Sequence, residues 1–274
     1  MSFSVYRKIA NLILLLVASN LSAQVTYYDA AEFQLLGKAT AATTERYVRL
    51  PDSLEHISRL PLWQLSRNSS GMAVRFRSNS TQVAVKWESL VNFHMDHMTD
   101  VAVKGLDLYC LEGKNWYFVN SARPIGKSTE SSLISGMEAK EREFMIYLPL
   151  YDGLVSLSIG IDAGASINQP AIESPVREKP VVFYGTSILQ GGCASRPGMA
   201  HTNIISRRLN RECINLGFSG NAFLDLGVAQ VMAGVDAGVF VLDFVPNVTV
   251  EQMNERMEKF YRILRDRHPH TPVI

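Results

Sequence analysis

The stretch that decides the fold is Val181-Val182-Phe183-Tyr184-Gly185-Thr186-Ser187, an apolar run followed by a glycine and two hydroxyl side chains. A continuous apolar run is typical of a strand that is buried on both faces of a sheet. Two further apolar runs follow, at residues 213–216 and 239–244, and stretches long enough for a helix separate the three runs. Buried strands that alternate with helices predict a parallel α/β sheet.

A short polar segment follows each predicted strand. These segments are Gly185-Thr186-Ser187, Gly217-Phe218-Ser219-Gly220-Asn221 and Pro246-Asn247. The carboxyl ends of parallel strands lie at one edge of a sheet, where ligands bind. The three segments are therefore expected to converge on one site.

The residue types at this edge are suited to acyl transfer. A strand-end serine such as Ser187 is a nucleophile if a base can take its proton. The backbone amides of Ser187 and Gly220 and the side-chain amide of Asn247 are candidate donors to an oxyanion. Each segment alone is also typical of a turn or a helix cap. Their occurrence in order, each directly after a buried strand, favours the catalytic interpretation.

Two helices are predicted in this half of the chain. Over residues 250–267, four apolar side chains fall on one stripe, Thr249 and Gln252 have the spacing of a capping box, and Pro269 lies beyond the end. The stripe consists of Met253, Met257, Phe260 and Leu264. A second helix is expected over residues 202–209, with Ile204, Ile205 and Leu209 facing inward and Arg207 and Arg208 facing solvent.

The preceding half has a different pattern. Short alternating segments separated by polar turns occur at residues 72–77, 82–87, 106–111, 116–119, 143–148 and 155–161, which predicts a β-sandwich or jelly roll. Proline and charged residues between 168 and 180 have the composition of a linker. We therefore predict a β-sandwich domain at 25–170, a linker at 171–179 and an α/β domain at 180–274.

The first residues predict a secretory signal. Arg7 and Lys8 precede the apolar run at 12–18, and small residues follow up to a predicted cleavage site after Ala23. The alternative is an uncleaved anchor, but a bilayer span needs about 20 apolar residues. A secreted or periplasmic protein without a membrane span is therefore expected.

Composition and cysteines narrow the possible partners. The formal charge of the 274-residue chain is +1 and no basic stripe stands out, so nucleic acid is not an expected partner. Cys110, Cys193 and Cys213 lack the spacing of metal ligands, and they are expected to be small buried side chains with at most one disulfide. No metal or organic cofactor is implied by any motif.

The region from Pro180 onward resembles the SGNH hydrolases, in the branch of GDSL-like acylhydrolases with a Gly-Thr-Ser motif. The resemblance is carried by residues 185–199, 215–221 and 242–247. Upstream, Gly105-Leu106-Asp107-Leu108-Tyr109 is similar to the Gly-x-Asp-Leu-Tyr signature of the β-sandwich that precedes such domains. The resemblance implies Ser187 as nucleophile and first oxyanion amide, Gly220 as second donor and Asn247 as third.

The family's fourth block, an Asp-x-x-His that supplies the base, is missing near the end of this sequence. His268 and His270 are expected at the amino edge of the sheet, away from Ser187. His201 is expected at the correct edge as a helix-start residue, and His94 and His97 as ordinary side chains of the other domain. We therefore expect a truncated α/β domain, with a fourth strand starting near Thr271, and little or no turnover.

The sequence is compatible with three functions. The first is a secreted esterase that removes a small acyl group, such as acetyl, from a carbohydrate or another alcohol. The second is a non-catalytic carbohydrate-binding or scaffold protein with a vestigial serine site; burial of Trp63, Trp87 and Trp116 would argue against glycan binding by the sandwich. The third is a lipase for long acyl chains, which predicts a broad apolar groove beside Ser187; the residues near Ser187, such as Gln190 and Arg196, do not indicate one.

Overall fold

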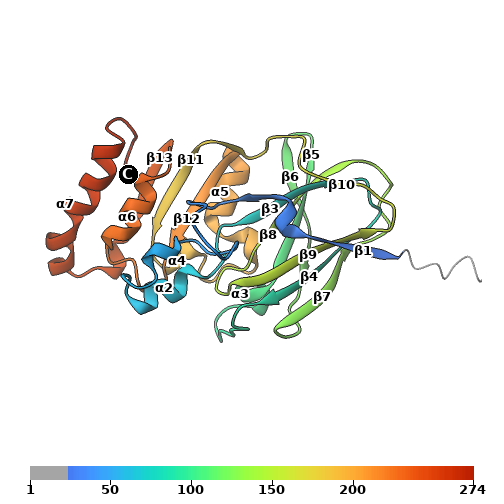
Figure 1. Cartoon of the computed structure of the whole chain (residues 1–274), viewed down its shortest axis with the longest axis horizontal. Coiled ribbons are helices and arrows are strands. Elements are labelled where there is room, and N and C mark those ends of the chain that lie inside the picture. The colour runs from blue at the N-terminus through green and yellow to red at the C-terminus, as the bar shows by residue number, and fades with distance from the viewer. Residues whose placement is uncertain (1–23) are drawn as a thin grey trace, which may run out of the picture.

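The computed structural model describes residues 24–274, and the predicted signal at 1–23 lies outside these described residues. The first half forms two packed antiparallel sheets, as predicted (Figure 1). One sheet has the order β1 (Val25–Asp29), β9 (Leu154–Asp162), β4 (Val83–Ser89), β7 (Ser128–Ile134). The other has the order β10 (Ile167–Asn168), β3 (Ala73–Ser78), β8 (Arg142–Tyr147), β5 (Leu106–Glu112), β6 (Asn115–Ala122), with β2 (Gln34–Leu36) paired to β3.

Strand β5 shows how the larger sheet is covered on both faces. Leu106, Leu108 and Cys110 lie in the core between the two sheets. The alternate residues Tyr109 and Leu111 belong to a separate buried cluster on the opposite face. Because side chains alternate along a strand, one strand contributes to the sandwich core and to the contact with the second half.

The second half is a parallel sheet in the order β12 (Arg211–Gly217), β11 (Val176–Gly185), β13 (Val239–Asp243). Near the end of the sequence, where a fourth strand was predicted, the structure has an isolated parallel bridge between Phe240 and Val273. Phe240 donates its backbone N–H to Pro272 at 2.9 Å, and Ile274 donates to Phe240 at 3.0 Å, so these residues pair in parallel with β13. Strand β11 begins inside the range assigned to the linker.

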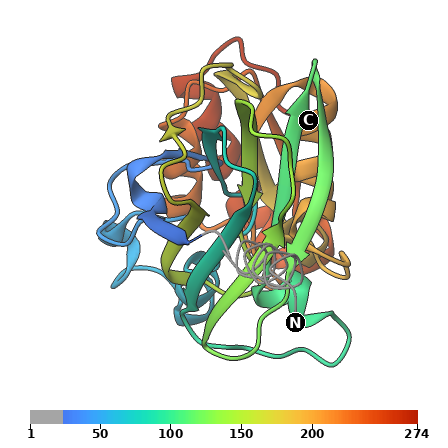
Figure 2. The same ribbon diagram turned by 90° about the vertical axis from the view of Figure 1, so that its right-hand side faces the viewer.

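Helices cover both faces of this sheet. Val182 and Tyr184 face a core that contains α6 (Leu226–Ala233) and α7 (Val250–Arg267). Val181 and Phe183 face the side of α4 (Ser187–Gln190) and α5 (His201–Leu209), where Leu189 and Ile205 pack. Seen from the sandwich end, the green strands lie in front of the orange and red helices (Figure 2).

The structure confirms one predicted helix in detail and corrects the other. Helix α7 spans the predicted residues with its capping box, and its apolar stripe packs on the sheet. In α5, however, Leu209 is 63% exposed, whereas the buried residues are Thr202, Asn203 and Ser206. The inward face of this short helix is mixed: Ile205 packs on the apolar side of the sheet, whereas Thr202 accepts a hydrogen bond from Asn215 and Asn203 donates one to the Pro197 carbonyl.

Part of the first half packs in the core of the second half. Leu50, Leu54 and Leu62 join the cluster around Val182 and Tyr184, with Leu54 in η2 (Asp52–Leu54) and Leu62 in α2 (Leu60–Ser66). The sequence patterns did not predict α2 or α3 (Asp100–Lys104). The domain boundaries stay a prediction, and the structure adds that residues 50–65 cover the α/β sheet.

A buried arginine joins the two halves. The Arg49 guanidinium donates to the carbonyls of Leu65 and Asn68 in the first half and of Asn215 and Gly217 in β12. Its side chain is buried and its guanidinium lies 4.7 Å from the Phe218 ring. Burial lowers the pKa of Arg49 to about 9. These hydrogen bonds position α2 against the carboxyl end of β12.

We predict that Arg49→Ala lowers the free energy of unfolding by about 3 kcal/mol or more, because it leaves buried carbonyls without donors. Arg49→Lys recovers only part of this loss, since an ammonium group cannot reproduce the planar fork. Urea unfolding measures both, and Arg208→Ala, at an exposed position, is the control with an expected change under about 0.5 kcal/mol. Equal losses in Arg49→Ala and Arg208→Ala would contradict the role of Arg49.

Candidate active site

The three predicted site segments leave the sheet at one level. Gly185 of β11 is in register with Gly217 of β12 on one side and with Asp243 of β13 on the other. Ser187, Gly220 and Asn247 therefore follow the carboxyl ends of three adjacent strands, as expected. The structure brings these residues to the same edge, and their catalytic roles stay a prediction.

Ser187 is the first residue of α4 and is partly exposed. Its carbonyl accepts hydrogen bonds from the Gly192 amide at 2.7 Å and from the Tyr151 hydroxyl at 3.1 Å. Gly185 must be a glycine here, since a Cβ would lie 2.4 Å from the Asp243 carbonyl oxygen. These contacts hold the turn in which the serine sits.

The loop with Gly220 is held by a buried glutamine. Gln190 accepts the Ser219 amide on its Oε1 at 2.9 Å and donates from its Nε2 to the Leu150 carbonyl. Gly220 itself has φ of +64° and is exposed, with open space where a Cβ would point. Its backbone is therefore accessible to a substrate oxygen.

Asn247 ends the 3-10 turn η4 (Val245–Asn247), and its side chain is fixed on the neighbouring loop. Its Oδ1 accepts the Ala222 amide at 3.2 Å. The other end of a side-chain amide is a donor. This contact fixes one end of the side-chain amide, and the oxyanion role of Asn247 stays a prediction.

Arg59 holds the same loop from the first half of the chain, and sequence reasoning missed it. Its guanidinium forms a bidentate ion pair with the Asp225 carboxylate, with N–O distances of 2.9 and 2.8 Å. It also donates to the side-chain oxygen and the backbone carbonyl of Asn221. It also lies 4.4 Å from the Phe223 ring. A single arginine in a polar segment carries no local sequence signal, so only the fold reveals this contact.

The Gly-x-Asp-Leu-Tyr signature contacts the loop that follows Ser187. Asp107 accepts the Gly198 amide at 2.8 Å and the Ser121 hydroxyl at 2.7 Å. Burial raises the pKa of Asp107, and these hydrogen bonds oppose the rise. A Cβ on Gly198 would lie 2.4 Å from the Tyr109 hydroxyl, so these two segments of the chain pack closely.

The same contact corrects the prediction for Arg207, which is not a solvated side chain. Its guanidinium lies 4.3 Å from the Tyr109 ring and donates to the Gly198 carbonyl at 2.8 Å. Arg208, its neighbour, is exposed as predicted. The sequence pattern could not distinguish the two arginines because the surface that Arg207 meets belongs to the other half.

Within residues 24–274, no histidine is hydrogen-bonded to the Ser187 hydroxyl. His268 contacts the Ala233 carbonyl at 2.8 Å and packs by Phe240, away from Ser187 as predicted. His201 starts α5, with its ring 6.4 Å from that of Phe183, and burial lowers its pKa. His94 and His97 are exposed and pair with Asp100 and Asp96.

Other predicted features have mixed outcomes. All three cysteines are free. Cys110 and Cys213 are buried, as expected, but Cys193 is exposed, contrary to the prediction.

Trp87 and Trp116 are buried, and Trp63 packs partly buried against the α/β core, which argues against a glycan platform made by these rings. In the described chain, no cluster of three or more potential metal ligands occurs, and no helix is both long and apolar enough to span a bilayer.

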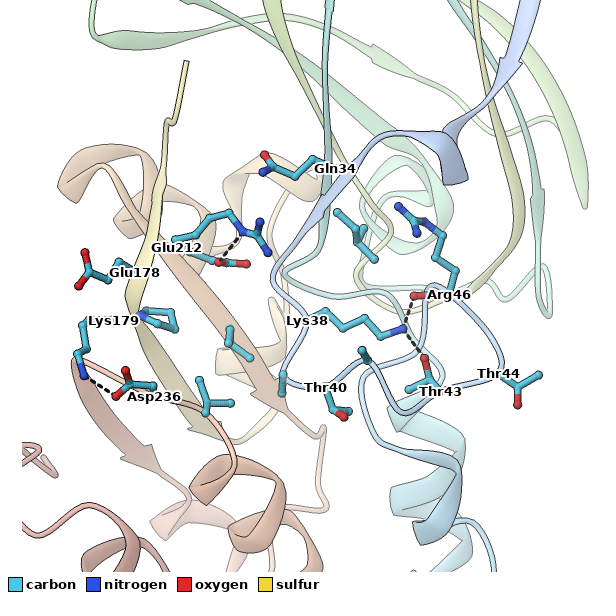
Figure 3. Close-up of a pocket in the computed structure, with 17 residues that line it drawn as sticks. Gln34, Lys38, Thr40, Thr43, Thr44, Arg46, Glu178, Lys179, Glu212 and Asp236 are labelled. Carbon is cyan, nitrogen blue, oxygen red and sulfur yellow. Dashed lines mark hydrogen bonds and ion pairs between the residues drawn. The ribbon is translucent and has the colours of Figure 1, made fainter. Parts of the chain in front are cut away.

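A cavity of about 810 Å³ lies at the opposite, amino edge of the α/β sheet. Figure 3 shows its cations turned to partners: Lys38 donates to Thr43 and to the Arg46 carbonyl, and Lys179 pairs with Asp236. Arg177 pairs with Glu212 at 3.7 Å. Because these charges are engaged and the cavity is remote from Ser187, it is not part of the acyl-transfer site.

The Thr186 hydroxyl generates a prediction about the nucleophile turn. It is buried and has no hydrogen-bond partner among the described residues. A valine has nearly the same shape and removes the unsatisfied hydroxyl, so Thr186→Val is expected to raise the free energy of unfolding by about 1 kcal/mol. Urea unfolding checks this, and Thr186→Ser, which keeps the hydroxyl, is the comparison. A loss of stability in Thr186→Val would show that the hydroxyl has a partner.

Comparisons with known proteins agree with this architecture. Residues 178–274 match the GDSL-like lipase/acylhydrolase family, and residues 25–167 match the N-terminal region of SGNH-hydrolase-type esterases. No curated protein matched the chain.

Among solved structures, a Bacteroides ovatus protein described as a GDSL-like lipase is 38% identical, with a TM-score of 0.86 over 91% of this chain and 73% of that one. A salicylyl acyltransferase of a tetracycline biosynthetic pathway shares 18% identity, with a TM-score of 0.68 over 92% of this chain and 69% of that one. An acetyl xylan esterase from Butyrivibrio proteoclasticus shares 12% identity, with a TM-score of 0.55 over 91% of this chain and 80% of that one. The last two show the fold alone. The 38% identity and the two family matches show that the chain belongs to the GDSL-like lipase/acylhydrolase family, with the N-terminal region of SGNH-type esterases before its hydrolase domain.

Proposed function

We propose that this chain carries the nucleophile and oxyanion site of a serine ester hydrolase that removes a small acyl group, such as acetyl, from a carbohydrate or another alcohol. Export after cleavage at Ala23 is part of the same proposal. The observation that carries it is that Gly185, Gly217 and Asp243 are in register at one edge of the sheet. Ser187, Gly220 and Asn247 follow these three residues closely in sequence.

In this reaction the Ser187 hydroxyl attacks the ester carbonyl while a base takes its proton. The negative charge that develops on the carbonyl oxygen is stabilised by the amides of Ser187 and Gly220 and by Asn247. The alcohol leaves with the proton, and water then releases the acid from the acylated serine. Gln190 and Arg59 act as positioning residues, because they hold the loops that carry the donors.

The base is the component that the described residues do not place at Ser187. Without a base the serine stays protonated, so we expect little turnover by the 274-residue chain. The alternative, a binding or scaffold protein with a vestigial site, has the same observation in its favour. The two readings differ in whether an external base restores chemistry.

The test is hydrolysis of p-nitrophenyl acetate by this chain with and without imidazole, and by a version extended through the downstream reading frame. We expect slow turnover alone and faster turnover with either addition. Ser187→Ala should abolish the part of the increase that exceeds hydrolysis by imidazole alone, and Asn247→Ala should lower kcat about a hundredfold, as loss of one oxyanion donor does.

Ser187→Ala also serves as the blank for hydrolysis by imidazole itself. Rapid Ser187-dependent turnover by the unaided chain would overturn the expected inactivity. Absence of Ser187-dependent turnover in every arm would overturn the esterase proposal and favour the binding protein.

A further inference from the structure

Tyr151 belongs to the first half of the chain, but its hydroxyl contacts the turn that begins with Ser187. It donates a hydrogen bond to the Ser187 carbonyl at 3.1 Å. The other donors to this carbonyl are the amides of Gly191 and Gly192, which belong to the turn itself. Among the described residues, Tyr151 is therefore the donor that ties this carbonyl to the first half.

The residue before Tyr151 is connected to the Gly220 loop. The Leu150 carbonyl accepts Gln190 Nε2 at 3.1 Å, and Gln190 Oε1 accepts the Ser219 amide at 2.9 Å. The Ser219 side chain also interacts with the Tyr151 hydroxyl, which opposes the rise that burial causes in the pKa of Tyr151. Two consecutive residues of the first half thus support both loops that carry a predicted oxyanion amide.

This support is itself fixed within the first half. The Leu150 amide donates to the Ala102 carbonyl and the Tyr151 amide to the Val103 carbonyl, both at 3.1 Å. All four side chains are buried, and Ala102 and Val103 lie in α3, just before the Gly-x-Asp-Leu-Tyr signature. A side chain that is locked by packing and hydrogen bonds can hold a neighbouring loop at a defined position.

The relative position of the two loops determines how well they stabilise an oxyanion. A donor is effective when it lies about 2.7 to 3.1 Å from the place where the anionic oxygen develops. The amides of Ser187 and Gly220 follow different strands, and Gly220 is exposed with a left-handed backbone. Contacts from neighbouring residues must therefore set the distance between these amides.

We propose that Tyr151 is a positioning residue of the oxyanion site, supplied by the first half of the chain. Its hydroxyl holds the Ser187 turn against the same support that carries the Gly220 loop, so that both amides point to one oxygen. This inference rests on the proposed function, because it assigns a further residue to that reaction. Tyr151 does not touch the reacting atoms in this role, and its proton stays on the tyrosine.

Amide hydrogen exchange in the full chain tests the support without any need for turnover. Tyr151→Phe keeps the buried ring and removes only the hydroxyl. Exchange is expected to become about tenfold faster at the amides of Gly192 and Ser219, while the amides of β8 stay within about twofold. Equally faster exchange in β8 would show a general loss of stability and would overturn the assignment.

Tyr27→Phe is the matched control for this measurement. The Tyr27 hydroxyl also donates one hydrogen bond, to Glu130 at 2.7 Å, but it lies in the smaller sheet of the sandwich. Its loss should leave exchange at Gly192 and Ser219 within about twofold of the unaltered chain. Equal exchange at these two amides in Tyr151→Phe and Tyr27→Phe would contradict a supporting role of the Tyr151 hydroxyl.

The kinetic test is imidazole-assisted hydrolysis of p-nitrophenyl acetate and of its thiono analogue, with Ser187→Ala in each background as the blank. Tyr151→Phe should lower kcat about tenfold and leave KM within about twofold, because the donors act mainly in the transition state. Preference for the oxygen ester depends on donors aligned with an anionic oxygen, so the ratio of the two rates should fall about tenfold. A residue that only stabilises the fold would leave this ratio unchanged.

The outcomes distinguish this inference from the proposed function. Ser187-dependent turnover whose kcat and ester ratio are the same in Tyr151→Phe and the unaltered chain refutes the inference and leaves the esterase standing. Absence of Ser187-dependent turnover in every variant refutes the esterase, and the exchange rates at Gly192 and Ser219 then decide whether Tyr151 supports the two loops.

Discussion

The buried guanidinium of Arg49, which has no carboxylate partner, joins the two halves of the chain. A buried charge is costly unless its hydrogen bonds are satisfied, and Arg49 satisfies them with carbonyls from α2, from the turn after it and from β12. These carbonyls come from segments that are more than a hundred residues apart in sequence. The position of β12 in turn sets where the Gly220 loop begins, and Arg59 and Gln190 then fix that loop from two sides. The predicted oxyanion donors therefore depend on residues from both halves of the chain.

Strand β5 also joins the two halves of the chain, through the loop that follows Ser187. Its inward residues complete the sandwich core, whereas Asp107 and Tyr109 face the loop after Ser187. The signature Gly-x-Asp-Leu-Tyr is thus a docking motif. Because successive side chains of a strand point to opposite faces, one set packs in the sandwich core and the other contacts the hydrolase half. The first half contacts the loop after Ser187 through this face, and its residues Leu90, Val91 and Phe93 line one groove together with Ser219 and Asn221.

Much of the fold could be predicted from the sequence because its signals are local. The apolar run before Ser187, the alternating runs of the sandwich and the capping box at Thr249 each depend on residues close in sequence, and the structure has these elements where they were predicted. The failures share a cause. Leu209 is exposed and Arg207 is packed, contrary to prediction, and the burial of Arg49 was not predicted at all. Each depends on surfaces contributed by distant segments, and a single sequence does not show which segments meet.

The position of residues 50–65 has a consequence for how the protein folds during synthesis. Leu50, Leu54 and Leu62 pack against strands β11 to β13, which the ribosome makes more than a hundred residues later. When the sandwich strands emerge, this segment has no partner, so its apolar side chains remain open to solvent or to chaperones until the α/β half is translated. The order of synthesis therefore makes this early segment among the last to reach its native packing.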